Sequence, residues 1–121
     1  KPKSSEDKFI TSIISGIEDV KGFDVSLLDL RKIDNTVCNY FILCTGSSNI
    51  HVNAITNAIK KKVKNSLKER PYHLEGKENS EWVLIDYINI VVHVFQKHTR
   101  KYYDIEGLWG DAQTTKIASN Y

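Results

Sequence analysis

The chain has 121 residues, of which 40% are hydrophobic and 26% are charged, and its formal net charge at pH 7 is +2. This length predicts one domain, and the composition is typical of a soluble globular protein with an ordinary core. No apolar run approaches the roughly 18 residues that a membrane-spanning helix needs. The net charge is too small to indicate a nucleic-acid partner by itself.

Residues 5–20 predict the first helix, because apolar side chains such as Ile13 and Ile17 recur at three- and four-residue steps. Ser5 is the expected N-cap, since a serine hydroxyl can accept from a free N–H of the first turn. Residues 1–4 are expected to be a disordered or tag-derived start, because the chain contains no methionine.

Two strands are predicted next, over residues 23–30 and 37–45, with a polar turn at residues 31–35 between them. The second strand is almost continuously apolar, which indicates burial on both faces and a central place in a sheet. Cys38 and Cys44 fall within it at an even offset, so we expect them on one face, about 20 Å apart and unable to form a disulfide with each other. Reduced, buried thiols fit a cytoplasmic protein.

A second helix is predicted to begin at an N-cap within residues 46–49 and to run to about Leu67, with Arg70-Pro71 beyond its end. Lysines gather in its second half, at positions 60, 61, 62, 64 and 68. Lysines on the back of a helix are most often simply solvated, but they are also a candidate contact for RNA, and a second candidate set is Lys97, Arg100 and Lys101. Residues 72–74 then predict a short edge strand.

Residues 80–95 predict a hairpin of two strands that are apolar on both faces, joined by a turn at residues 86–89. Residues 96–104 predict a short helix, and residues 113–121 an irregular tail because periodicity is lost there. In order, these elements predict a single α/β domain in which one mixed β-sheet is covered by helices. The connection that contains the lysine-rich helix is the one long enough for a parallel crossover.

Reactive chemistry has little support in the sequence. His93 and His98 are five apart and the other histidines stand alone, so no zinc-site spacing is present, and no metal or cofactor is expected. Ser47, Ser48 or Cys44 with a distant histidine would make a nucleophile–base pair, but a strand-to-helix turn with a helix cap explains these residues better. Such a turn can also hold a phosphate, although the glycine fingerprints and paired carboxylates of nucleotide-binding and nucleotidyltransferase sites are missing.

Aromatic side chains beside carboxylates are the strongest indication of function. Acidic residues stand at positions 81, 86, 104 and 106, close to several large rings. These aromatic residues are Trp82, Tyr87, Tyr102, Tyr103 and Trp109. An aromatic anchor rimmed by charge is typical of the hot spots of protein interfaces. The pattern therefore favours a protein-docking face over a catalytic site.

Several motifs of this chain occur together, in this order, in one known family. Residues 39–48 read Asn-Tyr-Phe-Ile-Leu-Cys-Thr-Gly-Ser-Ser, residues 80–87 read Ser-Glu-Trp-Val-Leu-Ile-Asp-Tyr, and residues 108–111 read Leu-Trp-Gly-Asp. With residues 91–95 and 103–106 between them, these motifs resemble the ribosomal silencing factor family, also called Iojap-like. The resemblance extends over residues 5–112, which we expect to be the family domain.

The resemblance implies a nucleotidyltransferase-like topology without enzymatic activity. It implies binding to the large ribosomal subunit through ribosomal protein number fourteen, and homodimers in the free state. A bound factor of this family keeps the small subunit from joining and lowers translation when nutrients are short, whereas organelle relatives act in large-subunit assembly. The expected compartment is the cytoplasm, or the organelle matrix in a eukaryote. The lysine-rich helix adds a candidate contact to ribosomal RNA.

The residues expected to bind the partner are acidic or aromatic, because ribosomal proteins are mostly basic and charge complementarity speeds encounter. They are Glu75, Glu81, Trp82, Asp86, His93, Tyr103, Asp104, Glu106 and Trp109. Two positions depart from the family pattern, which commonly has Asp in place of Asn39 and Gly in place of Ile88. Isoleucine is unfavourable at positive φ, so we expect a longer turn or a turn of another type there.

Overall fold

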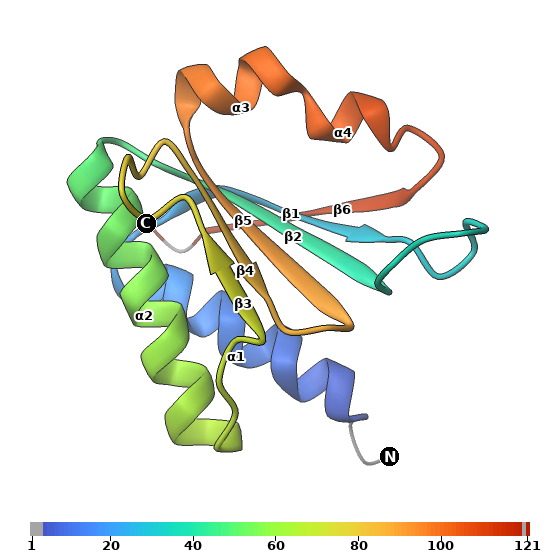
Figure 1. Cartoon of the computed structure of the whole chain (residues 1–121), viewed down its shortest axis with the longest axis horizontal. Coiled ribbons are helices and arrows are strands. Elements are labelled where there is room, and N and C mark those ends of the chain that lie inside the picture. Colours follow the sequence, from blue (N-terminus) through green and yellow to red (C-terminus); the bar gives the residue numbers. More distant parts are fainter. Residues whose placement is uncertain (1–3, 120) are drawn as a thin grey trace.

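The computed structural model describes residues 4–119 and 121, and its centre is a six-stranded sheet with helices on both faces (Figure 1). The elements are α1 (Ser5–Asp19), β1 (Phe23–Asp29), β2 (Tyr40–Gly46), α2 (Asn49–Leu67), β3 (His73–Glu75), β4 (Trp82–Asp86), β5 (Ile90–Gln96), α3 (Lys97–Tyr103), α4 (Ile105–Leu108) and β6 (Gln113–Ile117). The predicted mixed sheet covered by helices is therefore confirmed. Across the described ranges, each helix is too short or too polar to cross a membrane.

The sheet has the strand order β3-β4-β5-β2-β1-β6. β2 and β5 pair in parallel, and the other four pairs are antiparallel. The connection from β2 to β5 contains α2, β3 and β4, so the predicted crossover through the lysine-rich helix is confirmed. Every residue of β2 is buried, as the continuous apolar run of a central strand requires.

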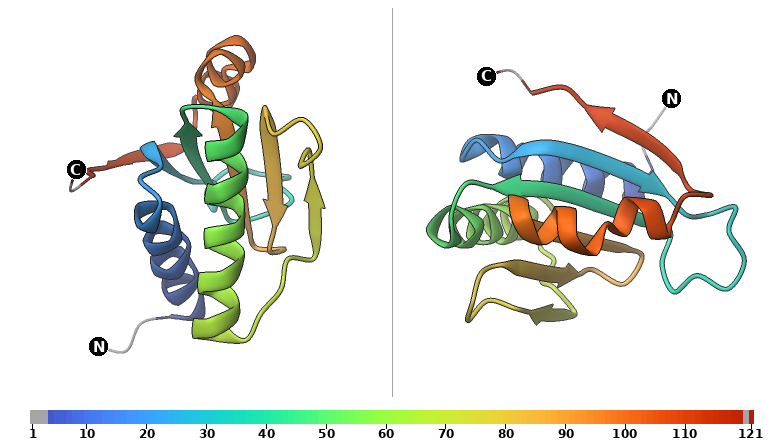
Figure 2. Two further views of the ribbon diagram at one scale, coloured as in Figure 1. Left: turned by 90° about the vertical axis from the view of Figure 1, so that its left-hand side faces the viewer. Right: turned by 90° about the horizontal axis from the view of Figure 1, so that it is seen from above.

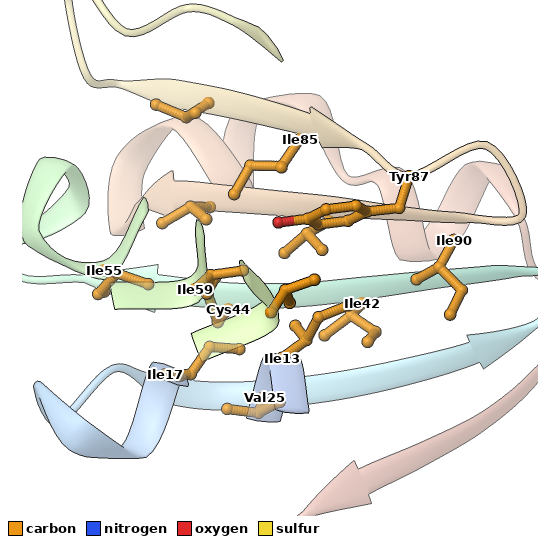
Figure 3. Packing of buried hydrophobic residues seen from close by; sticks show 14 of the residues in the cluster. Ile13, Ile17, Val25, Ile42, Cys44, Ile55, Ile59, Ile85, Tyr87 and Ile90 are labelled. Carbon is orange, nitrogen blue, oxygen red and sulfur yellow. The ribbon is translucent and has the colours of Figure 1, made fainter. Parts of the chain in front are cut away.

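α1 and α2 lie side by side against one face of the sheet and enclose the larger hydrophobic cluster (Figures 2 and 3). Ile13 and Ile17 of α1 and Ile55 and Ile59 of α2 are completely buried there. The two helices approach closely at Gly16, where a Cβ atom would lie 2.9 Å from the Cα atom of Ile59. This dense layer gives the sheet one fully covered face.

α3 and α4 cross the centre of the opposite face, while β3 and β4 extend beyond them at one side (Figure 2). A smaller cluster lies beneath these two helices. Its buried members are Leu28, Leu30, Cys38, Phe41, Leu43, Val91, Phe95 and Ile105. Since the two helices span only part of the sheet, strand side chains remain accessible beside them.

The C-terminal region corrects one prediction. The tail expected to be irregular contains β6, which pairs antiparallel with β1 from Val25↔Ile117 to Asp29↔Gln113. Four of the five side chains of β6 are exposed, so no apolar alternation marks the strand in the sequence. Backbone hydrogen bonding to β1 holds it in place, and Ile117 at its end packs against the larger cluster. Of the expected disordered start, residues 1–3 lie outside the described residues.

The start of α1 also differs from the prediction by one residue. Ser4, not Ser5, is the N-cap, and its Oγ atom accepts a hydrogen bond from the Asp7 N–H at 3.1 Å. The Asp7 carboxylate accepts in return from the Ser4 N–H at 3.4 Å. This reciprocal capping box satisfies two free donors of the helix end.

The two cysteines lie on opposite sides of the sheet, contrary to expectation. β2 begins at Tyr40, so Cys38 precedes the strand and packs into the smaller cluster, whereas Cys44 packs into the larger one. Both are buried free thiols, as predicted. Burial raises the pKa of Cys38 to about 11 and that of Cys44 to about 12, so both thiols are protonated at neutral pH.

The turn between β4 and β5 is not longer than usual, but it is of another type, with a hydrogen bond between residues two apart. Ile88 does adopt a positive φ, +75°, and remains 60% exposed. The Asn89 N–H donates to the Tyr87 carbonyl at 2.9 Å, and the Ile88 N–H donates to Asp86 Oδ1 at 2.7 Å. These bonds keep the turn short, although a β-branched residue is strained at this φ.

Candidate docking face

The hairpin of β4 and β5 and the helix α3 bring the rings of Trp82, Phe95 and Tyr103 together. The Trp82 ring lies 5.1 Å from that of Phe95 and 4.9 Å from that of Tyr103, measured between centroids. On the far side of His93, the Phe41 ring meets Trp109 edge-on at 5.5 Å. The sheet and the two helices above it are thus joined through aromatic contacts.

His93 lies inside this cluster and not on its surface, so the structure does not place it where a partner can touch it. Its side chain is 4% exposed, and its Nδ1 atom accepts a hydrogen bond from Trp82 Nε1–H at 3.0 Å. Burial lowers the pKa of His93 to about 4, which leaves the ring neutral at pH 7 with its proton on Nε2. Nε2 is buried and has no hydrogen-bond partner within the described residues.

Glu106 is also occupied within the fold. Its carboxylate accepts from Arg100 Nε at 3.2 Å and from Arg100 Nη2 at 2.8 Å, and Ser26 Oγ donates to it at 3.4 Å. The Arg100 guanidinium holds the pKa of Glu106 below its ordinary value. Glu106 therefore belongs to an internal network and not to an open rim.

Arg100 is the residue whose role the sequence analysis missed. Its guanidinium also donates to the Asp24 carbonyl, to Thr45 Oγ1 at 2.9 Å and to Ser26 Oγ at 3.3 Å. It therefore ties α3 to β1, β2 and α4. In the sequence, Arg100 cannot be told apart from the neighbouring basic residues Lys97 and Lys101. It is six residues from Glu106, a spacing that does not indicate an ion pair within one helix.

The remaining predicted residues are accessible on the side of the sheet that carries α3 and α4. Trp82, Asp86 and Trp109 are partly exposed. The exposed members are Glu75, Glu81, Tyr103 and Asp104. The structure thus brings most of the predicted set to one side of the molecule. We call these seven residues the docking face.

Asp104 has a structural task as well as an exposed carboxylate. It ends α3 with a φ of +46° and begins α4, where its Oδ1 atom accepts from the Gly107 N–H at 3.2 Å. A change at Asp104 would therefore alter the path of the chain between the two helices. Charge tests of the docking face are better made at Glu81, which is exposed and forms a 3.5 Å contact to His98.

The serine turn before α2 is a helix cap. Ser48 Oγ accepts from the His51 N–H at 3.1 Å, while His51 Nδ1 accepts from the Ser47 N–H at 2.9 Å and lies 3.1 Å from Ser47 Oγ. The other ring nitrogen of His51 contacts the Val20 carbonyl at 2.7 Å. Both ring nitrogens of His51 contact backbone groups. Ser48 and His51 therefore stabilise the start of α2.

No group of three or more His, Cys, Asp or Glu side chains in the described ranges is arranged to hold a metal ion. The arrangement on the α3 side is instead a broad face with large rings at its centre and carboxylates around them. Such a face can bind another macromolecule by shape and charge.

By its fold, the chain is a single mixed α/β domain with an aromatic cluster under two short helices. A family model described as "Ribosomal silencing factor during starvation" matches residues 2–120. The chain belongs to the ribosomal silencing factor family. This confirms the family that the motifs resemble.

Known proteins agree with this assignment. The ribosomal silencing factor RsfS of Halalkalibacterium halodurans is 36% identical over 113 residues, which cover 93% of this chain and 95% of that protein. A crystal structure of a Chromobacterium violaceum protein superimposes with a TM-score of 0.82 at 36% identity, covering 98% of this chain and 94% of the other. A mouse protein named "Mitochondrial assembly of ribosomal large subunit protein 1" is 31% identical over 87 residues, 67% of this chain and 38% of that protein.

Proposed function

We propose that this protein represses translation by docking on the large ribosomal subunit and blocking the approach of the small one. The docking face is proposed to bind ribosomal protein number fourteen, as the family resemblance implies. The observation that carries this proposal is the aromatic cluster of Trp82 and Tyr103 with Glu81 and Asp86 around it, within a family of ribosomal silencing factors. A steric block needs a rigid face and no reactive group, and such a role fits the cytoplasm or an organelle matrix.

The rigidity of this face has a clear structural origin. The rings rest on β4 and β5, which are central or next to central in the sheet, and Arg100 fixes the helices above them. A prearranged face loses little conformational entropy on binding. Carboxylates at its rim complement a basic ribosomal protein.

The proposal is tested with the variant Glu81→Lys/Tyr103→Ala. We expect this variant to bind purified large subunits at least about tenfold more weakly than the unmodified protein, because it removes an exposed ring and reverses a rim charge. Co-sedimentation over a range of subunit concentrations measures the affinity. Addition of small subunits then tests whether bound protein prevents their joining.

The matched control is Glu18→Lys, which changes one charge equally but lies on α1, on the face of the sheet opposite α3. It should bind like the unmodified protein, and both variants should keep the native circular dichroism spectrum. Equal binding by all three proteins would remove the docking face from the proposal. Normal subunit joining on saturated large subunits would refute the steric block.

We infer a second contact, to ribosomal RNA, from a groove between α2 and β3. The groove measures about 640 Å³ and is lined by Lys60, Lys61, Lys64 and Arg70, with Glu69 the opposing charge. Within the described residues, none of these four cations forms an ion pair, whereas Lys62 pairs with Asp19 at 3.0 Å. Unpaired cations along a groove suit a phosphate backbone.

Salt dependence tests this RNA contact. For Lys61→Gln/Lys64→Gln, we expect the slope of log affinity for large subunits against log salt concentration to fall by about 1 to 2, because each phosphate contact contributes about 0.7 to 0.9. The control Lys8→Gln/Lys32→Gln removes the same charge outside the groove. Its salt dependence should stay as steep as that of the unmodified protein, and steeper than that of Lys61→Gln/Lys64→Gln. Identical slopes for the two double variants would exclude RNA from the groove.

For the free protein we propose a homodimer, as the resemblance implies. The outer edge of β6 is the feature that favours it, because β6 pairs only with β1 among the described strands. Backbone groups along such an edge can pair with a second copy.

A further inference from the structure

A small apolar depression lies at the end of the sheet farthest from α3. Its volume is about 400 Å³, and its lining consists of Val37, Tyr72, Asp86, Ile88 and Val91. Three of these side chains are large, apolar and mostly exposed: Val37 at 91%, Tyr72 at 76% and Ile88 at 60%. Three segments distant in sequence thus contribute apolar surface to one place that the chain itself leaves open.

Backbone hydrogen bonds make this depression rigid. The Tyr72 N–H donates to the Asp86 carbonyl at 2.7 Å, which fixes the segment before β3 to the end of β4. The Asn39 N–H donates to the Asn89 carbonyl at 2.8 Å, which fixes the loop before β2 to the β4–β5 turn (Figure 1). The walls are therefore prearranged and are not three independent loops.

Asp86 supplies the charge of this depression. It is the one ionisable acid or base among the lining residues apart from the tyrosine phenol. One carboxylate oxygen, Oδ1, accepts from the Ile88 N–H, and the carboxylate forms no ion pair within residues 4–119 and 121. A cation entering the depression therefore meets an available carboxylate.

The depression is continuous with the docking face. Trp82, Leu84 and Asp86 alternate along β4 toward the same side of the sheet, and Asp86 is the register partner of Val91 on β5. Trp82 stands at the α3 end of this row and Asp86 at the other. A partner that covers Trp82 and extends along β4 reaches the depression.

From this chemistry we propose that the depression is a subsite for an arginine side chain of the basic ribosomal protein bound by the docking face. The aliphatic stem would lie against Val37, Ile88 and Val91, and the guanidinium would pair with Asp86 and lie on the exposed Tyr72 ring. Arginine fits better than lysine, because a planar guanidinium can bind a carboxylate and stack on an aromatic ring together. RNA is disfavoured, since the carboxylate repels phosphate.

Strain at Ile88 accords with this assignment. A β-branched side chain at a φ of +75° is held away from its preferred conformation, and Ile88 is 60% exposed in the lining that it shares with Asp86. Strain of this kind persists where the surrounding hydrogen bonds fix the backbone, and it is most common at binding sites.

The subsite rests on the proposed function, but part of its test does not need ribosomes. N-acetyl-arginine amide is titrated into the 15N-labelled full chain at millimolar concentrations. We expect saturable shifts of the amide signals around Val37, Ile88 and Val91, weaker shifts with the lysine analogue, and none in Asp86→Asn. Asparagine keeps the oxygen that accepts from the Ile88 N–H, so the turn is retained. Absence of shifts at the depression, or equal shifts in Asp86→Asn, would overturn the proposal.

Binding to purified large subunits supplies the second measurement. We expect Asp86→Asn and Tyr72→Ala each to weaken binding about tenfold. Glu18→Gln on α1, the charge-matched control, should bind within about twofold of the unmodified protein. If both depression variants bind normally while Glu81→Lys/Tyr103→Ala does not, the subsite is wrong and the docking face stands. If the unmodified protein does not bind large subunits, the proposed function itself is wrong.

Discussion

Replacement of Arg100 by methionine is expected to lower the free energy of unfolding by about 3 kcal/mol at pH 7. The Arg100 side chain is only 12% exposed, and methionine keeps most of its apolar stem. The change leaves the Thr45 hydroxyl and the Asp24 carbonyl without the Arg100 donor, and it leaves the Glu106 carboxylate with only the 3.4 Å hydrogen bond from Ser26 Oγ. Partly buried polar groups that lose their hydrogen-bond donor account for the lower free energy of unfolding. Urea unfolding followed by tryptophan fluorescence measures it.

Arg31→Met is the matched control, because Arg31 pairs with Asp29 at the same 2.8 Å distance but is 55% exposed. We expect this control to lose much less stability than Arg100→Met, because an exposed ion pair contributes little. In the Arg100→Met background, Glu106→Gln should restore part of the stability by removing the uncompensated charge. Equal losses for the two arginine variants would show that the Arg100 network does not hold α3 and α4 on the sheet.

Acidification is expected to destabilise the protein through His93. The neutral ring resists protonation in the fold down to a pKa of about 4, whereas the unfolded chain takes up this proton near the ordinary value of 6.5. The unfolded state therefore binds more protons between these two values, and stability falls as the pH falls. The full difference amounts to about 3 kcal/mol, from 1.36 kcal/mol for each pKa unit. Urea unfolding at several pH values between 7 and 4 measures this loss.

His93→Gln separates this effect from general acid sensitivity. Glutamine still offers an acceptor to the Trp82 indole but does not titrate, so the dependence of stability on pH between 6.5 and 4.5 should become flatter. His98→Gln, an exposed change on α3, should keep the slope of the unmodified protein. Slopes, not absolute stabilities, are compared, because His93→Gln also alters packing. Parallel curves for all three proteins would show that His93 is not the group responsible.

The elements with strong apolar periodicity were predictable from the sequence. α1, α2, β2 and the β4–β5 hairpin each bury a stripe or a continuous run, and hydrophobic burial decides their position. β6 was not predictable in this way, because its side chains face solvent and its place depends on hydrogen bonds to a strand near the other end of the chain. Local sequence carries little information about such long-range pairing.

The location of the candidate site was predictable from the sequence. Which of its residues are exposed and which are occupied within the fold was not predictable. The sequence placed aromatic and acidic residues in one region, and the structure brings most of them to one side of the sheet. It did not distinguish His93, which is buried, and Glu106, which is paired with Arg100, from Glu81 and Tyr103, which are exposed. That distinction depends on where α3 crosses the sheet and on Arg100, whose partners come from distant segments.

The pairing of the first strand with the last also has a consequence for synthesis. While the nascent chain emerges from the tunnel, β1 can find its neighbour β2 early, but its other side remains vacant until β6 has been translated. During that interval the growing polypeptide offers a free hydrogen-bonding edge to other chains nearby. The sheet is therefore completed only after β6 has emerged, when its pairing covers the open edge of β1.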